Sequence, residues 1–163
     1  MRVYLPATAA DLSAPQIGPR TAHAVTPALA RALPDEDEEG LETSASLCAA
    51  DASLMLLTAP GAESLADRRV VIAADVEDAR VTEPAAGEDV LPGTIRVEAP
   101  VGWEDAAALL VDEPAAEADV RAARTGDEEA LERAAEADLL WYDVSEREPL
   151  AAELACGPDR PAR

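Results

Sequence analysis

The chain has 163 residues, including 34 acidic residues and 13 basic ones that are all Arg, and it contains no Lys, Asn or Phe. The net charge of −21 argues against nucleic acid and anionic lipid surfaces as partners, because both are polyanions that would repel the protein. Two explanations of the acidity stay open: a solvated surface that keeps the protein in solution, and adaptation to a saline cytoplasm in which salt screens the repulsion.

Short apolar segments near the start of the chain predict two strands and a helix. Residues 2–5 form the first expected strand, which Pro6 closes, and residues 22–25 form the second. A turn-rich stretch lies between them. Thr26 is a good N-cap and Pro27 a good first helical residue, so we expect a short helix over residues 27–33.

The longest expected helix follows an acidic run, Asp35 to Glu39, and ends at Pro60-Gly61. Acids in a first turn favour the positive end of the helix dipole. The apolar stripe recurs at steps of four and three, as an amphipathic helix requires. Its members are Leu41, Ala45, Cys48, Ala52 and Met55.

Three further segments predict strands. Residues 70–74 are apolar without interruption, which is typical of a central strand. Residues 94–99 alternate between apolar and polar side chains, as a half-exposed strand does. Residues 108–111 form the fifth expected strand, after a helical turn that starts at Trp103, and residues 80–82 add a short pairing.

The C-terminal part predicts two helices and a tail. The first helix opens at Asp112 and runs to about Arg124. Thr125 and Glu128 have the spacing of a capping box, so we expect Thr125 to cap a last helix that reaches about Arg147. Its expected apolar face contains Leu131, Ala135, Leu139 and Tyr142.

These elements together predict an α+β fold with two layers. We expect about five short strands in one mixed sheet, with three to four helices packed on it. Residues 1–148 are expected to form a single domain and residues 149–163 a flexible C-terminal tail, because Pro149 and Gly157-Pro158 favour fraying.

The sequence contains no persuasive metal or cofactor motif. The run Asp35-x-Asp37-x-Glu39-Gly40 resembles the start of a calcium loop, but Ser46 occupies the position where the loop needs a bidentate Glu. An acidic helix start explains the run better. Cys48 and Cys156 lie far apart and lack zinc-site spacing. We therefore expect no metal, no cofactor and no phosphate-binding loop.

His23 and Asp75 are the candidates for chemistry. His23 is the only imidazole and would serve as a general base if the carboxylate of Asp75, at the end of a strand, oriented it. The other explanation is a packed histidine and an Asp that enters a loop or caps a helix. Neither cysteine nor any serine has the surroundings of a nucleophile.

Trp141 and Tyr142 form the densest aromatic pair in a chain with four aromatic residues. Neighbouring helical positions point about 100° apart, so both rings cannot face the core squarely. Tyr142 lies on the expected apolar stripe and Trp141 at its rim. Trp141 is thus either a partner-binding residue or part of the core packing.

Four stretches resemble an uncharacterised family of short acidic proteins from GC-rich actinobacteria. They are MRVYLPAT, TAHAVTPAL with LPDEDEE, RRVVIAADV and DLLWYDVSE, in this order. Relative to that family the chain is shortened between Leu12 and Pro19, where a longer helix would follow the first strand. The resemblance implies an ordinary rather than a saline cytoplasm, and it carries over no catalytic residue.

The sequence favours a cytoplasmic protein-binding or regulatory domain without catalytic activity, whose acidic surface suits a basic protein partner. No apolar run is long enough to span a membrane or to form a signal peptide. The alternative is a small-molecule-binding protein or hydrolase with a pocket near Tyr4, His23 and Asp75. A deep apolar cavity would favour the alternative, whereas a flat surface with an exposed Trp141 would favour the binding domain.

Overall fold

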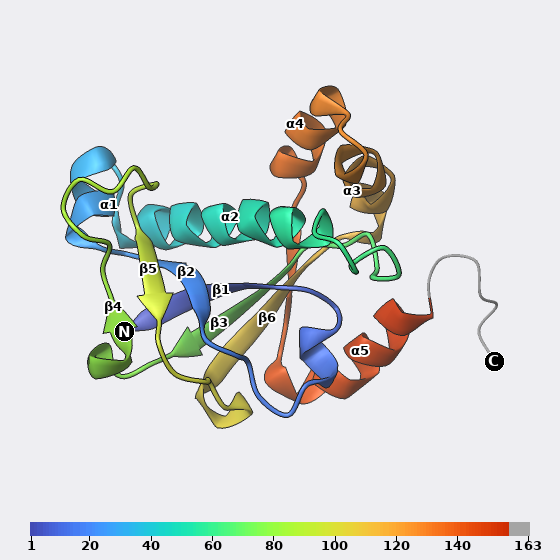
Figure 1. Ribbon diagram of the computed structural model, residues 1–163, viewed down its shortest axis with the longest axis horizontal. Helices are drawn as coiled ribbons and strands as arrows, with labels where there is room; N and C mark the ends of the chain where they lie inside the picture. The colour runs from blue at the N-terminus through green and yellow to red at the C-terminus, as the bar shows by residue number, and fades with distance from the viewer. Residues whose placement is uncertain (157–163) are drawn as a thin grey trace.

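The computed structural model describes residues 1–156, which form one open sheet with helices on both of its faces (Figure 1). The sheet has seven strands in the order β4-β5-β2-β1-β3-β6-β7, and every neighbouring pair is antiparallel. The strands are β1 Arg2–Ala7, β2 Arg20–Ala24, β3 Val70–Asp75, β4 Val81–Thr82, β5 Thr94–Val97, β6 Ala106–Asp112 and β7 Leu139–Tyr142.

The described residues contain five α-helices. The side chain of Thr26 accepts a hydrogen bond from the backbone N–H of Leu29, which confirms the predicted cap of the first helix. The acidic run opens the second helix as predicted, since Asp37 is its N-cap. The helices are α1 Pro27–Ala32, α2 Glu38–Leu57, α3 Glu117–Arg124, α4 Glu128–Glu136 and α5 Arg147–Ala155.

The α+β class is confirmed, but the expected mixed sheet of about five strands and three to four helices is wrong. The sheet is antiparallel throughout, and β7 and α5 were not predicted. The expected last helix ends at Glu136, and Asp127 rather than Thr125 caps it by accepting from the N–H of Ala130. Helical spacing of Leu131 and Leu139 misled the prediction, because widely spaced apolar residues fit a helix and a following strand equally well.

Helix α5 begins at Arg147 and extends into the segment that the sequence suggested was a tail. Pro149 lies in its first turn, where a missing backbone N–H removes no helical hydrogen bond. Leu150 and Leu154, four residues apart, are both buried. Residues 149–155 of the expected tail therefore belong to a helix, and residues 157–163 lie outside the described part of the chain.

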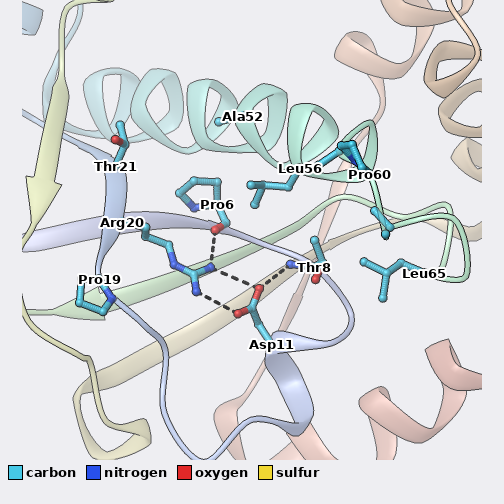
Figure 2. Close-up of a pocket in the computed structure, with 13 residues that line it drawn as sticks. Pro6, Thr8, Asp11, Pro19, Arg20, Thr21, Ala52, Leu56, Pro60 and Leu65 are labelled. Atoms are coloured by element: carbon cyan, nitrogen blue, oxygen red, sulfur yellow. Dashed lines mark hydrogen bonds and ion pairs between the residues drawn. The ribbon is translucent and has the colours of Figure 1, made fainter.

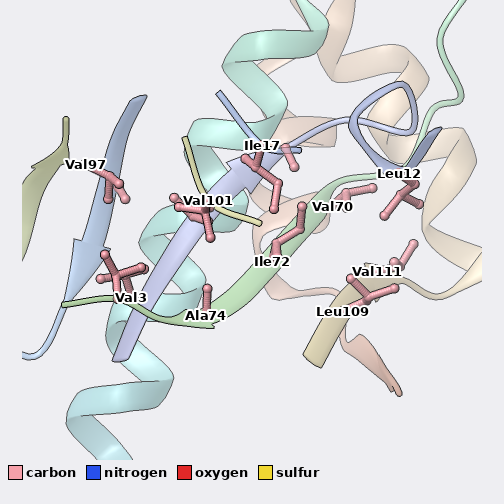
Figure 3. Close-up of a cluster of buried hydrophobic side chains, with 14 of the residues drawn as sticks. Val3, Leu12, Ile17, Val70, Ile72, Ala74, Val97, Val101, Leu109 and Val111 are labelled. Carbon is pink, nitrogen blue, oxygen red and sulfur yellow. The ribbon is translucent and has the colours of Figure 1, made fainter. Parts of the chain in front are cut away.

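The sheet is packed on both sides, so the two-layer expectation is too simple. Helix α2 lies across one face of the sheet (Figure 1). Its small residues, such as Ala45 and Ala49, share a buried cluster with Tyr4 and Ala73. Small side chains allow a helix to approach a sheet closely. The opposite face packs against α5 and the segment after β1. Its core includes Val3, Leu12, Ile17, Val70, Ile72, Leu109 and Val111 (Figure 3).

A buried ion pair joins β3, β6 and β7. Arg69 precedes β3 and Asp112 ends β6, and both side chains are 0% exposed. Arg69 Nη2 donates to Asp112 Oδ1 at 2.8 Å, and the backbone N–H of Arg69 donates to Asp112 Oδ2 at the same distance. Arg69 Nη2 also reaches the carbonyl of Ala137, just before β7. Asp112 therefore ends a strand and anchors the core, rather than opening the helix predicted there.

Candidate functional site

Tyr4 and His23 lie directly opposite each other on β1 and β2, on the side of the sheet that α2 covers. Both side chains are buried. Burial raises the pKa of Tyr4, and the nearby carboxylate of Glu42 raises it further. Burial lowers the pKa of His23, whose Nδ1 has no hydrogen-bond partner among the described residues. His23 is thus a packed imidazole whose protonation is disfavoured by burial.

Asp75 does not orient His23. It lies at the end of β3 opposite Arg2, on the other side of β1 from His23. Its carboxylate accepts two hydrogen bonds from Arg2, from Nε at 2.8 Å and from Nη2 at 3.0 Å, and this pairing lowers the pKa of Asp75. A general base needs a partner that holds its tautomer and orientation. The described residues supply no carboxylate for that purpose.

Replacing His23 by Gln is expected to reduce the loss of stability on mild acidification. Burial lowers the pKa of folded His23 below its ordinary value of 6.5, so the unfolded chain binds the proton more readily. The contribution of neutral His23 is therefore complete above that ordinary value and decreases as the pH falls toward the pKa of the folded state.

Urea unfolding between about pH 8 and 5.5, above the range in which most carboxylates titrate, measures this effect. The difference in unfolding free energy between wild type and His23→Gln should shift with pH, with a slope of at most about 1.4 kcal/mol per pH unit. A difference that stays constant over this range would show that His23 has the same pKa in both states.

Trp141 and Tyr142 lie on β7, the strand at one edge of the sheet. Their side chains point to opposite faces of the sheet, as those of neighbouring strand residues do. Tyr142 packs against the core opposite α2. Trp141 pairs with Leu110 on the α2 side and is 63% exposed. The indole is therefore available to a partner.

A shallow groove of about 210 Å³ joins Trp141 to Tyr4. Its floor is formed by strand residues on the α2 side of the sheet, and its wall by the first half of α2. The wall contributes Glu39, Glu42, Thr43 and Ser46. Neither His23 nor Asp75 lines this groove. The structure thus brings together two of the sequence-predicted residues, Tyr4 and Trp141, from strands at the centre and the edge of the sheet.

Sequence reasoning missed the acidic wall of this groove. Residues 39, 42, 43 and 46 have the spacing of one helix face, and that pattern was available in the sequence. The exposed ring of Trp141 lines the same groove as the carboxylates of Glu39 and Glu42. An aromatic face and a negative charge both attract an ammonium or guanidinium group, so the groove can accept a cation. Arg2 also lines the groove, and its guanidinium is paired with Asp75.

A second cavity, of about 620 Å³, lies between the second half of α2 and the start of β2 (Figure 2). Leu56 and Leu65 contribute apolar surface, and Arg20 and Asp11 form its charged part. Arg20 Nη2 donates to Asp11 Oδ1 at 2.9 Å, and Arg20 Nη1 donates to the carbonyl of Pro6. The charged groups are thus paired with the protein itself, and Tyr4, His23 and Asp75 lie elsewhere.

In the described part of the chain, no three His, Cys, Asp or Glu side chains are arranged to hold a metal ion. No helix within residues 1–156 combines the length and the apolar character needed to cross a membrane.

The fold and the groove define a class: an α+β protein with an open antiparallel sheet and an exposed aromatic residue at one edge. The chain belongs to a family of unknown function, DUF6912, whose model matches residues 1–151. This match agrees with the resemblance to an uncharacterised family. Neither a curated protein nor a solved structure matches the chain.

Proposed function

We propose that the chain is a cytoplasmic protein-binding domain without catalytic activity, which binds a basic segment of another protein at the surface around Trp141. The observation that carries the proposal is the exposed indole of Trp141, which shares a groove with the carboxylates of Glu39 and Glu42. Trp side chains are highly buried on average, and Trp is enriched among the residues that dominate binding energy at interfaces.

Charge supports a basic partner over other classes. The chain carries a net charge of −21, which attracts a cationic segment and speeds its encounter. The same charge repels nucleic acid and anionic membranes. Burial of His23 and the pairing of Asp75 with Arg2 argue against a hydrolase at those residues. The cavity in Figure 2 is at another place, and its charges are paired internally.

Replacing Trp141 by Ala is expected to weaken binding of a basic peptide by about 30-fold, the effect of losing a hot-spot residue worth about 2 kcal/mol. Fluorescence anisotropy of a labelled Arg-rich peptide, at low and at high KCl, measures this loss. Binding should weaken with salt, because the groove carboxylates and the peptide attract each other through screened charges.

Two matched variants separate the groove from the general charge of the protein. Glu42→Gln should weaken binding, whereas Glu83→Gln, an exposed acid near β4 at the far edge of the sheet, should change it less although it removes the same charge. Equal binding by wild type and Trp141→Ala, or binding of an acidic peptide as tightly as the basic one, would contradict the proposal.

A further inference from the structure

The two edges of the sheet differ in how they are protected. Exposed strand edges attract other strands, and proteins commonly protect them with short strands, charges or Pro. The edge strand β4 has only two residues, Val81 and Thr82. The other edge, β7, has the sequence LLWY without a charge or a Pro, and both Leu140 and Trp141 are exposed.

The register shows which backbone groups of β7 face outward. The N–H of Glu113 donates to the carbonyl of Asp138. Further along the same ladder, residue 111 pairs with Leu140 and residue 109 pairs with Tyr142, at steps of two residues on each strand. Antiparallel pairs alternate between hydrogen-bonded and non-hydrogen-bonded residues. Leu140 and Tyr142 therefore bond to β6, and the N–H and C=O groups of Leu139 and Trp141 point away from it.

From these observations we infer that the basic segment binds by adding an antiparallel strand to β7. This inference rests on the proposed function and specifies its geometry. Backbone groups of Leu139 and Trp141 would supply the hydrogen bonds, as in other cases of strand addition. Antiparallel addition continues the pattern of all the ladders in the described sheet.

The charges around β7 indicate what kind of partner can bind at this edge of the sheet. Asp138 and Asp143 flank β7, and Glu39 and Glu42 line the groove that Trp141 also lines. A second copy of the chain would bring another net charge of −21 to the same edge, which disfavours a dimer through β7. A strand with Arg at alternate positions would instead place a guanidinium on the face of Trp141, close to the groove carboxylates.

The geometry of the ladder predicts which N–H groups of a bound peptide would donate hydrogen bonds to β7. In a hydrogen-bonded antiparallel pair the two residues exchange N–H and C=O bonds, and their side chains lie on the same face of the sheet. The residue opposite Trp141 therefore has its side chain on the same face of the sheet as Trp141 and the groove, and its N–H directed at β7. In an eight-residue peptide that alternates Arg and Val, the Arg residues should occupy these positions.

Backbone methylation of the peptide tests the inference. A fluorescent peptide of alternating Arg and Val is compared with two versions, one N-methylated at every Arg and one at every Val. Methylation at Arg should weaken binding to the full chain by at least about tenfold, because it removes the N–H groups that bond to β7. Methylation at Val should change binding by less than about threefold.

The outcomes distinguish the inference from the function on which it rests. If both methylated peptides bind equally, strand addition is wrong, even if Trp141→Ala still weakens the unmodified peptide. If the unmodified peptide does not bind at all, the proposed function itself fails. Sedimentation of the free protein is the control for self-pairing, and a dimer that Trp141→Ala dissociates would show that a second copy occupies the edge instead.

Discussion

Replacing Asp112 by Asn is expected to lower the free energy of unfolding by about 3–5 kcal/mol, because it leaves the charge of Arg69 without its buried partner. Arg69 is fully buried, and Asp112 accepts hydrogen bonds from its Nε, its Nη2 and its backbone N–H. The Asn side chain keeps the shape but not the charge. Asp51 lies 3.6 Å from Arg69 Nη1 and offers only partial compensation, since its side chain is 60% exposed.

The exposed pair between Arg2 and Asp75 provides a matched control. It also joins an Arg to a carboxylate by two hydrogen bonds, but both side chains contact solvent. Asp75→Asn should therefore cost no more than about 1 kcal/mol. Urea unfolding at neutral pH measures both variants. A similar, small loss in both would show that the Arg69–Asp112 pair is not an anchor of the core.

Replacing Leu109 by Ala is expected to destabilise the protein by about 2–5 kcal/mol, through lost burial and the cavity left behind. Leu109 is 0% exposed on β6, where it pairs with Ile72 of β3 and Tyr142 of β7. The core around it contains many Ala and Val side chains, which are too short to extend into the space. The loss should lie toward the upper part of the range.

Leu131 on α4 supplies the same substitution at a surface position, since its side chain is 44% exposed. Leu131→Ala should cost less than about 1 kcal/mol, because little apolar area returns to water. Thermal and urea unfolding of the two variants give the comparison. Equal losses of unfolding free energy in the two variants would mean that the core repacks around residue 109 and fills the space that the Leu side chain leaves.

Local chemistry was sufficient to predict several elements. Thr26 and Pro27 started α1, the acidic run with Asp37 started α2, and the apolar run at residues 70–74 became the strand β3. Each of these signals depends on groups within a few residues of one another. Such groups act in the same way in the unfolded chain and in the fold, so the sequence alone indicates them.

The end of the chain illustrates the opposite case. Residues 139–142 form a strand although Leu139 and Tyr142 also fit a helical stripe. Pairing with β6 decides between the two states, since each hydrogen bond in the ladder comes from a residue about thirty positions away. Pro149 likewise belongs to a helix because Leu150 and Leu154 are buried in the core opposite α2.

Some features of the candidate site were likewise visible in the sequence, whereas others depend on the tertiary structure. The sequence identified Tyr4, His23, Asp75, Trp141 and Tyr142 by their residue types, and its composition determined that the protein is strongly acidic and has few large core side chains. Only the tertiary structure decided that Asp75 pairs with Arg2, that His23 is buried, and that Trp141, Glu39 and Glu42 line one groove. The reason is physical: these outcomes depend on sheet register and strand order, which are set by contacts between segments distant in sequence.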